Sequence, residues 1–171
     1  IWCQWYKKYI HLNKKTSQYV EQEYQQLFSG KQKVLGVICR GTDYLALKPS
    51  GHPVQPSTEQ VIKACKEYIK RDGYDAIYLA TEECKIRDEF EKAFPVKILE
   101  NKRVYYDDIY DQDDSIAYIK DVHFERENDR YLSGLEYLSS IILLSRCSAL
   151  VGGNCGGTLG ALFFNDEQYQ F

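Results

Sequence analysis

The chain has 171 residues, of which 44% are hydrophobic and 27% charged, and its formal net charge is −3. This size and composition predict one globular domain with a hydrophobic core. The slightly acidic balance argues against general electrostatic binding to nucleic acid or to an anionic membrane. No apolar segment approaches the roughly 20 residues that a membrane span requires.

The six cysteines are scattered along the chain and include no C-x-x-C pair. Cys39 lies in an apolar run and Cys65 on an apolar helix face, so both are expected to be small buried hydrophobic residues. Without a disulfide framework or a signal peptide, the sequence fits a reducing cytoplasm best. Because the chain opens on Ile1 and contains no methionine, we expect it to be a piece of a longer protein.

Residues 1–30 predict two amphipathic helices. In the first, apolar side chains recur every three or four residues: Trp2, Trp5, Tyr6, Tyr9 and Ile10. We interpret this stripe as packing, within the domain or against a preceding domain, rather than as a ligand site. The second helix is expected to begin at Thr16 or Ser17 and to end near 29–30.

From residue 31 onward, strands and helices alternate. Apolar runs predict strands at 34–39, 76–80, 96–99 and 148–151. A capping box at 57–60 opens a helix that ends at 72–73, and further helices are expected at 84–94, from 128 or 129 to 146, and at 159–164. Strands buried on both faces and separated by helices are typical of a doubly wound parallel α/β sheet, which is Rossmann-like.

The segment 101–129 is rich in tyrosine and acid and shows no clear element. It contains Asp111-x-Asp113, a pair of the kind that holds a divalent metal beside a sugar nucleotide. Such a pair normally ends an apolar strand, whereas this one lies among polar residues. We therefore interpret it as a solvated loop and expect no metal site.

Polar residues follow the first strand directly. Arg40, Gly41, Thr42 and Asp43 come after the apolar run 34–39, and a parallel sheet binds its ligands at the carboxyl ends of its strands. The Arg40 guanidinium can form two parallel hydrogen bonds to phosphate oxygens, and Asp43 can orient it. The alternative is a structural Arg–Asp pair that holds the loop.

A second polar cluster follows the last strand, and it is rich in glycine: Gly152, Gly153, Asn154, Cys155, Gly156, Gly157 and Thr158. A strand, a glycine turn and a helix start together direct backbone N–H groups toward one point, a geometry that suits phosphate. The cluster lacks the P-loop pattern, and a dinucleotide fingerprint would follow the first strand instead. The alternative is a tight turn that packs the helix on the strand.

Three segments are similar to the motifs of a known family. The segment 37–43, VICRGTD, followed by His52-Pro53, resembles the first motif of the GDP-fucose-dependent α-1,6- and protein O-fucosyltransferases. The segments 77–82, IYLATE, and 144–151, LSRCSALV, resemble the second and third motifs. With KPSGHPVQP at 48–56, the whole pattern resembles bacterial GT-B-type glycosyltransferases of surface-polysaccharide synthesis more closely still.

The resemblance assigns roles to several residues. It makes Arg40 the arginine that grips the donor diphosphate and stabilises the departing nucleotide, and Asp43 the acidic residue of the same motif. It gives donor contacts to Gly41 and Thr42, to Thr81 and Glu82, and to the glycine cluster. Two positions depart from the α-1,6 enzymes: Ile38 stands where they have a histidine near the guanine, and Lys48 where they have a proposed catalytic carboxylate. His52 and Lys48 are the candidate acid or base residues.

The resemblance implies a domain organisation and an activity. Residues 1–30 would lead from a missing N-terminal domain, and 31–171 would form the nucleotide-sugar-binding domain of a two-domain GT-B enzyme. This enzyme would transfer a sugar from a nucleoside diphosphate, such as GDP-fucose, to a glycan acceptor without a metal or other cofactor. We expect it in the bacterial cytoplasm or at the inner face of the membrane, and the isolated chain would bind donor without transferring sugar.

Two alternatives stay open from sequence. One is a nucleotide- or phosphosugar-binding module without catalysis. The other is an NAD-dependent oxidoreductase, which would need a G-x-G-x-x-G after the first strand, a place where this chain has residues 40–43 instead.

Overall fold

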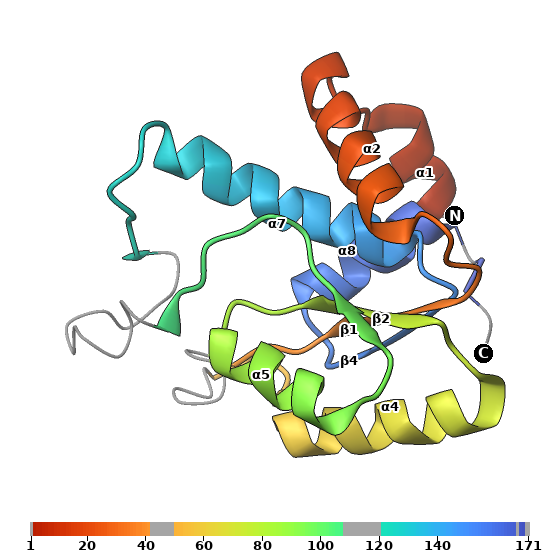
Figure 1. The fold of residues 1–171 in the computed structure, drawn as a ribbon. Helices are drawn as coiled ribbons and strands as arrows, with labels where there is room; N and C mark the ends of the chain where they lie inside the picture. Colours follow the sequence, from red (N-terminus) through yellow and green to blue (C-terminus); the bar gives the residue numbers. More distant parts are fainter. Residues whose placement is uncertain (1, 42–49, 108–120, 167, 170–171) are drawn as a thin grey trace.

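A computed structural model describes residues 2–41, 50–107, 121–166 and 168–169. Within these ranges the chain forms an α/β fold around a four-stranded, all-parallel sheet (Figure 1). The strands are β1 (Val34–Ile38), β2 (Ala76–Ala80), β3 (Lys97–Leu99) and β4 (Ala149–Gly152), in the spatial order β3-β2-β1-β4. This arrangement confirms the predicted parallel sheet.

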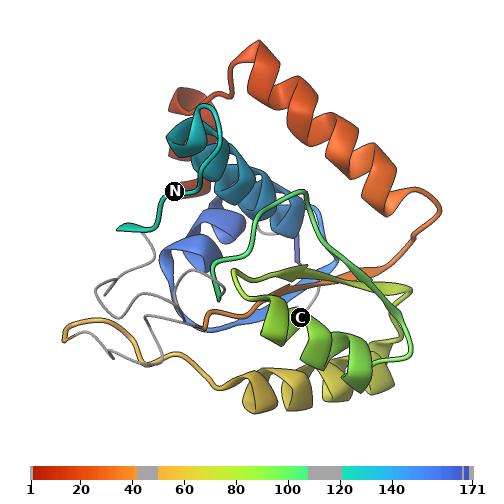
Figure 2. The same ribbon diagram turned by 60° about the vertical axis from the view of Figure 1, so that its left-hand side comes forward.

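Helices cover both faces of the sheet (Figures 1 and 2). One face carries α4 (Thr58–Asp72) and α5 (Cys84–Ala93), and the other carries α7 (Asp129–Ser145) and α8 (Gly156–Asn165). A further layer is made by α2 (Lys14–Phe28), which packs on α7, and by α1 (Trp2–Tyr9), which packs on α8. The sheet is therefore doubly wound, as expected.

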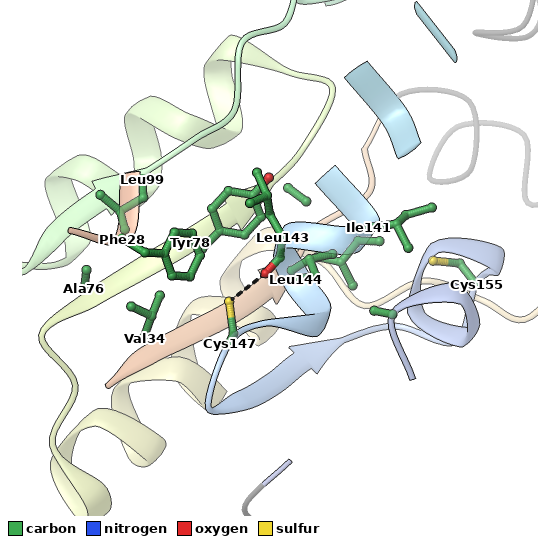
Figure 3. Close-up of a cluster of buried hydrophobic side chains, with 13 residues drawn as sticks. Phe28, Val34, Ala76, Tyr78, Leu99, Ile141, Leu143, Leu144, Cys147 and Cys155 are labelled. Carbon is green, nitrogen blue, oxygen red and sulfur yellow. Dashed lines mark hydrogen bonds between the residues drawn. The ribbon is translucent and has the colours of Figure 1, made fainter. Parts of the chain in front are cut away.

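Alternation along β1 divides the core into two clusters. Val34 and Ile38 point toward α7 and α8, whereas Leu35 and Val37 point toward α4 and α5. Figure 3 shows the first cluster, where Tyr78 of β2 is enclosed among the side chains of that face. Because side chains on both faces are buried, β1 and β2 read as unbroken apolar runs.

The capping box of α4 is present as predicted. The Ser57 hydroxyl accepts from the N–H of Gln60, and the Gln60 side chain accepts from the N–H of Ser57. The helix ends at Gly73, whose φ of +66° lies in the left-handed region that favours glycine.

Two local predictions were wrong. The N-cap of α2 is Asn13, whose side chain accepts from the N–H of Thr16 at 2.9 Å, so neither Thr16 nor Ser17 begins the helix. Helix α8 begins at Gly156, three residues earlier than expected, so the last two glycines of the cluster belong to its first turn. The α1 stripe is divided: Tyr6 packs on α8, as expected for packing within the domain, whereas Trp2, Trp5, Tyr9 and Ile10 are exposed. Packing of these four against a preceding domain stays a prediction.

The order of the strands creates one switch point in the sheet. The chain moves from β1 outward to β2 and β3, and then returns through α7 to β4 on the opposite side of β1. Ligands of such sheets bind beyond the carboxyl ends of the strands where the direction reverses. Here that place lies between β1 and β4.

Among the residues described, no helix has the length and apolar character that crossing a bilayer requires.

Candidate functional site

The switch point brings together two of the predicted clusters. Arg40 and Gly41 follow β1, and the glycine turn follows β4, whose Gly152 pairs with Ile38 in the register of the two strands. The sheet therefore places the arginine motif beside the glycine cluster. Thr42, Asp43 and Lys48 lie outside the described residues, so the predicted Arg40–Asp43 pair is not part of this description.

Arg40 faces a carboxylate from the neighbouring strand β2. Its Nη1 lies 3.8 Å from Oε1 of Glu82, and the two side chains keep 14% and 11% of their surface exposed. At 3.8 Å this pair is longer than a hydrogen bond, so it attracts and orients the guanidinium without a direct donor–acceptor contact. Glu82 is therefore a carboxylate beside Arg40 that the sequence analysis had not paired with it, and the Arg40–Asp43 pair stays a prediction.

Gly41 allows a close approach of the chain to the Glu83 side chain. A Cβ at position 41 would overlap the Glu83 carboxylate, so only glycine fits this place without a shift. Two carboxylates, of Glu82 and Glu83, therefore lie at the start of the arginine motif. Their negative charge repels anions. A phosphate can bind here only if its attraction to the cations and N–H groups exceeds its repulsion by the two carboxylates.

The turn after β4 is held by contacts that the sequence did not reveal. Gln55, which is buried, donates through Nε2 to the Asn154 carbonyl at 2.9 Å, and its side chain lies directly against Gly153. The Thr158 hydroxyl donates to the Gly153 carbonyl at 2.6 Å. The hydroxyl hydrogen of Thr158 is therefore used within the turn.

The glycines of the cluster divide into two kinds. Gly152 and Gly157 both lie against the side chain of Ile38, and a Cβ at Gly157 would come within 2.6 Å of Ile38 Cδ1. A Cβ at Gly156, by contrast, would meet nothing within 4 Å, and this glycine is exposed. Gly157 therefore allows α8 to pack on β1 and Gly152 allows β4 to lie against Ile38 of β1, whereas Gly156 faces open space.

The start of α8 supplies N–H groups to this open space. Cys155 is its N-cap and provides no side-chain capping hydrogen bond. In any α-helix the first N–H groups have no intrahelical carbonyl, and here these belong to Gly156, Gly157 and Thr158. Together with the positive end of the helix dipole, they favour an anion beside the β1–β4 switch point.

After β2, the polar side chain of Thr81, predicted to contact the donor, forms a hydrogen bond within the turn. Thr81 is only 1% exposed, and its hydroxyl accepts from the N–H of Glu83 at 3.3 Å, so it stabilises the turn from below the surface. Asp107 accepts from the N–H groups of Cys84 and Lys85 at 2.9 and 3.3 Å and so satisfies the start of α5. This buried aspartate was missed because its partners lie more than 20 residues away.

The remaining candidates lie around this edge. His52 is exposed on the segment that Gln55 anchors to the turn, and Asn154 is exposed with its carbonyl engaged by Gln55. Asp111 and Asp113, the rejected metal pair, lie outside the described ranges. Within those ranges, no group of three or more His, Cys, Asp or Glu side chains has the arrangement of a metal site.

A cavity of about 420 Å³ adjoins the end of β2. Tyr106, which lines it, donates its N–H to the Glu82 carbonyl at 2.9 Å and places its ring edge-on to Phe124. Burial raises the pKa of the Tyr106 hydroxyl. The other lining residues mix both charges: Asp121, Val122, His123, Asp129, Arg130 and Ser133.

The two buried thiols of the α4 face behave as predicted. Burial raises the pKa of Cys39 and of Cys65 to about 12, so both stay protonated at neutral pH. They are packing residues and not nucleophiles.

No protein-family model matches this chain, and no curated protein is significantly similar to it. The function proposed below therefore depends on the chemistry of the site itself and on the motif resemblance.

Proposed function

We propose that the chain is the donor-binding part of a GT-B-type, fucosyltransferase-like glycosyltransferase that uses a nucleoside-diphosphate sugar. The observation that carries the proposal is that Arg40 follows β1 and the open start of α8 follows β4, the strand that pairs with β1 at the switch point. A cationic fork on one side and backbone N–H groups on the other form a site for a diphosphate. The resemblance makes a GDP-sugar such as GDP-fucose the expected donor and a surface glycan the expected acceptor.

The same groups account for the chemistry of transfer. Breaking the bond between the sugar and the phosphate leaves negative charge on the departing diphosphate. Fixed N–H donors and a partly buried guanidinium stabilise this charge without the reorganisation that water would need. In this proposal the Glu82 carboxylate keeps Arg40 in place, because an oriented arginine loses less conformational freedom on binding.

The acceptor hydroxyl must lose a proton during transfer. His52 is the described candidate for the base, since it is exposed on the segment that borders the glycine turn. Lys48 is the second candidate. Either group would need to come within hydrogen-bond reach of the acceptor hydroxyl.

Nucleotide binding can be tested by thermal unfolding with GDP, UDP, GMP and NAD at equal concentrations. A ligand that binds only the folded chain raises its stability by RT ln(1 + [L]/Kd), so the nucleoside diphosphates should raise Tm more than GMP does. Equal and negligible shifts for every nucleotide would refute the proposal. The largest shift with NAD would favour an oxidoreductase instead.

The role of Arg40 is tested by Arg40→Lys and Arg40→Ala, with Arg71→Ala as the control. Lysine keeps the charge but lacks the planar fork, so both Arg40 variants should lose at least about tenfold in GDP affinity. Arg71 is exposed on α4 and pairs with Asp72, and its loss should leave binding unchanged. Unchanged affinity in both Arg40 variants would assign the arginine to the structural pair with Glu82.

Metal independence gives a separate test. Calorimetric titration of GDP with excess chelator and with Mg²⁺ should give affinities that agree within about threefold, because Arg40 and the α8 N–H groups would neutralise the diphosphate charge that a metal neutralises in other sites. A tenfold loss of affinity on chelation would show that the sequence interpretation of Asp111 and Asp113 was wrong.

A non-catalytic binding module is the second candidate, and the two carboxylates beside Arg40 favour it. Glu82 and Glu83 reduce the positive potential that would stabilise a leaving diphosphate. Slow hydrolysis of the donor sugar by the wild-type chain that is lost in Arg40→Lys would support catalytic machinery. Tight binding with no hydrolysis would support the module.

A further inference from the structure

The outer face of α1 combines exposed aromatic rings with positive charge, and the proposed function uses neither. We call this surface the α1 face and define it by Trp2, Trp5, Tyr9, Ile10 and Lys8. It lies on the outer side of the layer formed by α7 and α8 (Figures 1 and 2).

The rings of the α1 face are unusually exposed. Trp2 keeps 75% of its surface exposed and Trp5 58%, and Tyr9 and Ile10 are exposed by about half. Trp2, Trp5 and Tyr9 are spaced by three and four residues, so they form one stripe on the helix, and the rings of Trp5 and Tyr9 lie 5.3 Å apart. Large apolar side chains grouped in this way mark a surface that meets another body.

The inner side of α1 is already occupied. Tyr6 stacks on Phe163 at 5.5 Å and meets Phe164 edge-on at 5.0 Å, and Lys7 forms an ion pair with Asp166. These contacts fix α1 on α8 with its Trp stripe outward. The exposed stripe therefore belongs to a helix that the domain itself holds in place.

The N-terminal segment that carries this face is basic, although Lys7 within it is paired with Asp166. Residues 1–20 contain four lysines and no acidic residue, although the whole chain has a net charge of −3. Lys8 and Lys15 lie over the rings of Tyr9 and Tyr131 at 5.2 and 5.4 Å, so both cations border aromatic surface. The overall charge, which argued against attraction to an anionic membrane, conceals a basic segment at one end of the molecule.

We propose that the α1 face docks the protein on the surface of a lipid bilayer that contains anionic lipids. Tryptophan and tyrosine favour the headgroup region because their rings are apolar and each carries a polar group. Lysines beside them are attracted to anionic headgroups, and a helix of this kind lies in the plane of the interface. This inference does not depend on the proposed glycosyltransferase function.

The aromatic rings and the lysines of the α1 face should act together in binding. A few interfacial rings alone bind a neutral bilayer weakly, and lysines alone bind only at low salt. We therefore expect binding that needs anionic lipid, weakens as salt increases, and places the rings at headgroup depth. The charge complementarity favours an anionic bilayer over a second copy of the chain, because two copies of a basic face would repel each other.

The chain offers a direct spectroscopic probe. Trp2 and Trp5 are its two tryptophans, so the tryptophan fluorescence of the protein reports on the α1 face alone. We expect a blue shift of the emission on adding vesicles of phosphatidylglycerol and phosphatidylcholine, and quenching by lipids brominated near the headgroup. Vesicles of phosphatidylcholine alone should cause little change at physiological salt.

Charge variants test the mechanism. Lys8→Glu with Lys15→Glu should weaken binding to the anionic vesicles at least about tenfold, since each lysine near the surface adds about a fivefold gain. The matched control is Lys63→Glu with Lys66→Glu on α4, which makes the same change of charge at exposed positions. This control should reduce binding by less than about threefold.

Three outcomes would overturn the proposal. The first is the absence of a blue shift with anionic vesicles, and the second is an equal loss of binding in both lysine pairs. The third is a blue shift that follows protein concentration or added single-stranded DNA rather than lipid, which would assign the face to self-association or to nucleic acid. Far-UV circular dichroism of each variant confirms that it is folded before binding is compared.

Discussion

Gly157 gives the sharpest test of how the site is built, because a single atom, Ile38 Cδ1, determines how much stability an alanine at this position loses. A Cβ at Gly157 would lie 2.6 Å from Ile38 Cδ1, and its next neighbour, the Tyr137 hydroxyl, would be at 3.4 Å. Gly157→Ala should therefore force apart the start of α8 and the end of β1. Overpacking of this kind costs about 1–3 kcal/mol, and the gain from replacing glycine in a helix offsets at most about 1 kcal/mol of it.

Ile38→Val removes the clashing atom while keeping the strand. Alone it should cost about 1 kcal/mol, as expected for the loss of one buried methyl group. Combined with Gly157→Ala it should restore much of the lost stability, because the new methyl group fills the space that Cδ1 leaves. The double variant should thus be at least about 1 kcal/mol more stable than the sum of the single changes predicts.

The matched control is Gly156→Ala, one residue earlier in the same helix. A Cβ there meets nothing within 4 Å, so the free energy of unfolding should stay within about 0.5 kcal/mol of the wild type. In the proposed site, however, Gly156 faces the ligand, and its alanine variant should bind GDP more weakly. Gly157→Ala should therefore lower stability, whereas Gly156→Ala should weaken GDP binding and leave stability nearly unchanged.

The assay is urea unfolding followed by far-UV circular dichroism. Tryptophan emission is unsuitable, since both tryptophans are already exposed on α1. The reasoning is refuted if Gly157→Ala is as harmless as Gly156→Ala, or if Ile38→Val fails to rescue it. The first result would mean that the glycine is not required for packing, and the second that a contact other than Ile38 Cδ1 causes the loss of stability.

Further predictions concern local stability. Ser57→Ala removes the capping hydrogen bond to the Gln60 N–H and should lower the free energy of unfolding by about 1 kcal/mol in urea titration; an unchanged midpoint would contradict the capping role. Asp75 accepts from the N–H groups of Lys33 and Gln32, which hold its pKa below the usual value of 3.8. A depressed folded-state pKa stabilises the fold above pH 3.8 and the contribution disappears as pH falls below it. The stability gap between wild type and Asp75→Asn should accordingly narrow from pH 6 to pH 3, and a constant gap would disprove the linkage.

The sheet was predictable because its strands are buried on both faces. Val34 to Ile38 and Ala76 to Ala80 are unbroken apolar runs, and the structure gives these bounds with changes of one residue at most. The box at Ser57 and Gln60 is likewise a local signal, complete within four residues. Where an element is determined by residues close together in the sequence, composition and periodicity are enough to predict it.

The errors arose where the deciding contact is distant or where two local signals compete. Asn13 and Thr16 are both of residue types that cap helices. The first turn of α2 is polar, so the spacing of apolar residues could not show which of the two is the N-cap. Gln55 and Asp107 reach across 99 and 23 residues to hold the site's turns, and no spacing rule predicts such partners. Glycine disfavours helix, so α8 was expected to begin after the glycine run, whereas it begins at Gly156 with Gly157 packed on Ile38.

In the proposed site, Ile38 bears on which nucleotide base can be recognised. The α-1,6 enzymes that the motif resembles have a histidine here, near the guanine, but in this chain the side chain is apolar and lies between Gly152 and Gly157. An apolar group offers no hydrogen bond to a base, and strong discrimination between ligands requires polar groups that the wrong ligand leaves unpaired.

We therefore expect GDP and UDP to bind with affinities within about tenfold of each other, while removing one phosphate weakens binding far more. Calorimetric titration of GDP, UDP and GMP against the wild type and Ile38→Val measures both differences. Ile38→Val should leave the ratio of GDP to UDP affinity unchanged, because it replaces one apolar side chain with another. A preference for GDP above about a hundredfold would contradict the assignment and place a base-reading group elsewhere in the chain. A ratio that changes in Ile38→Val would instead show that position 38 touches the base after all.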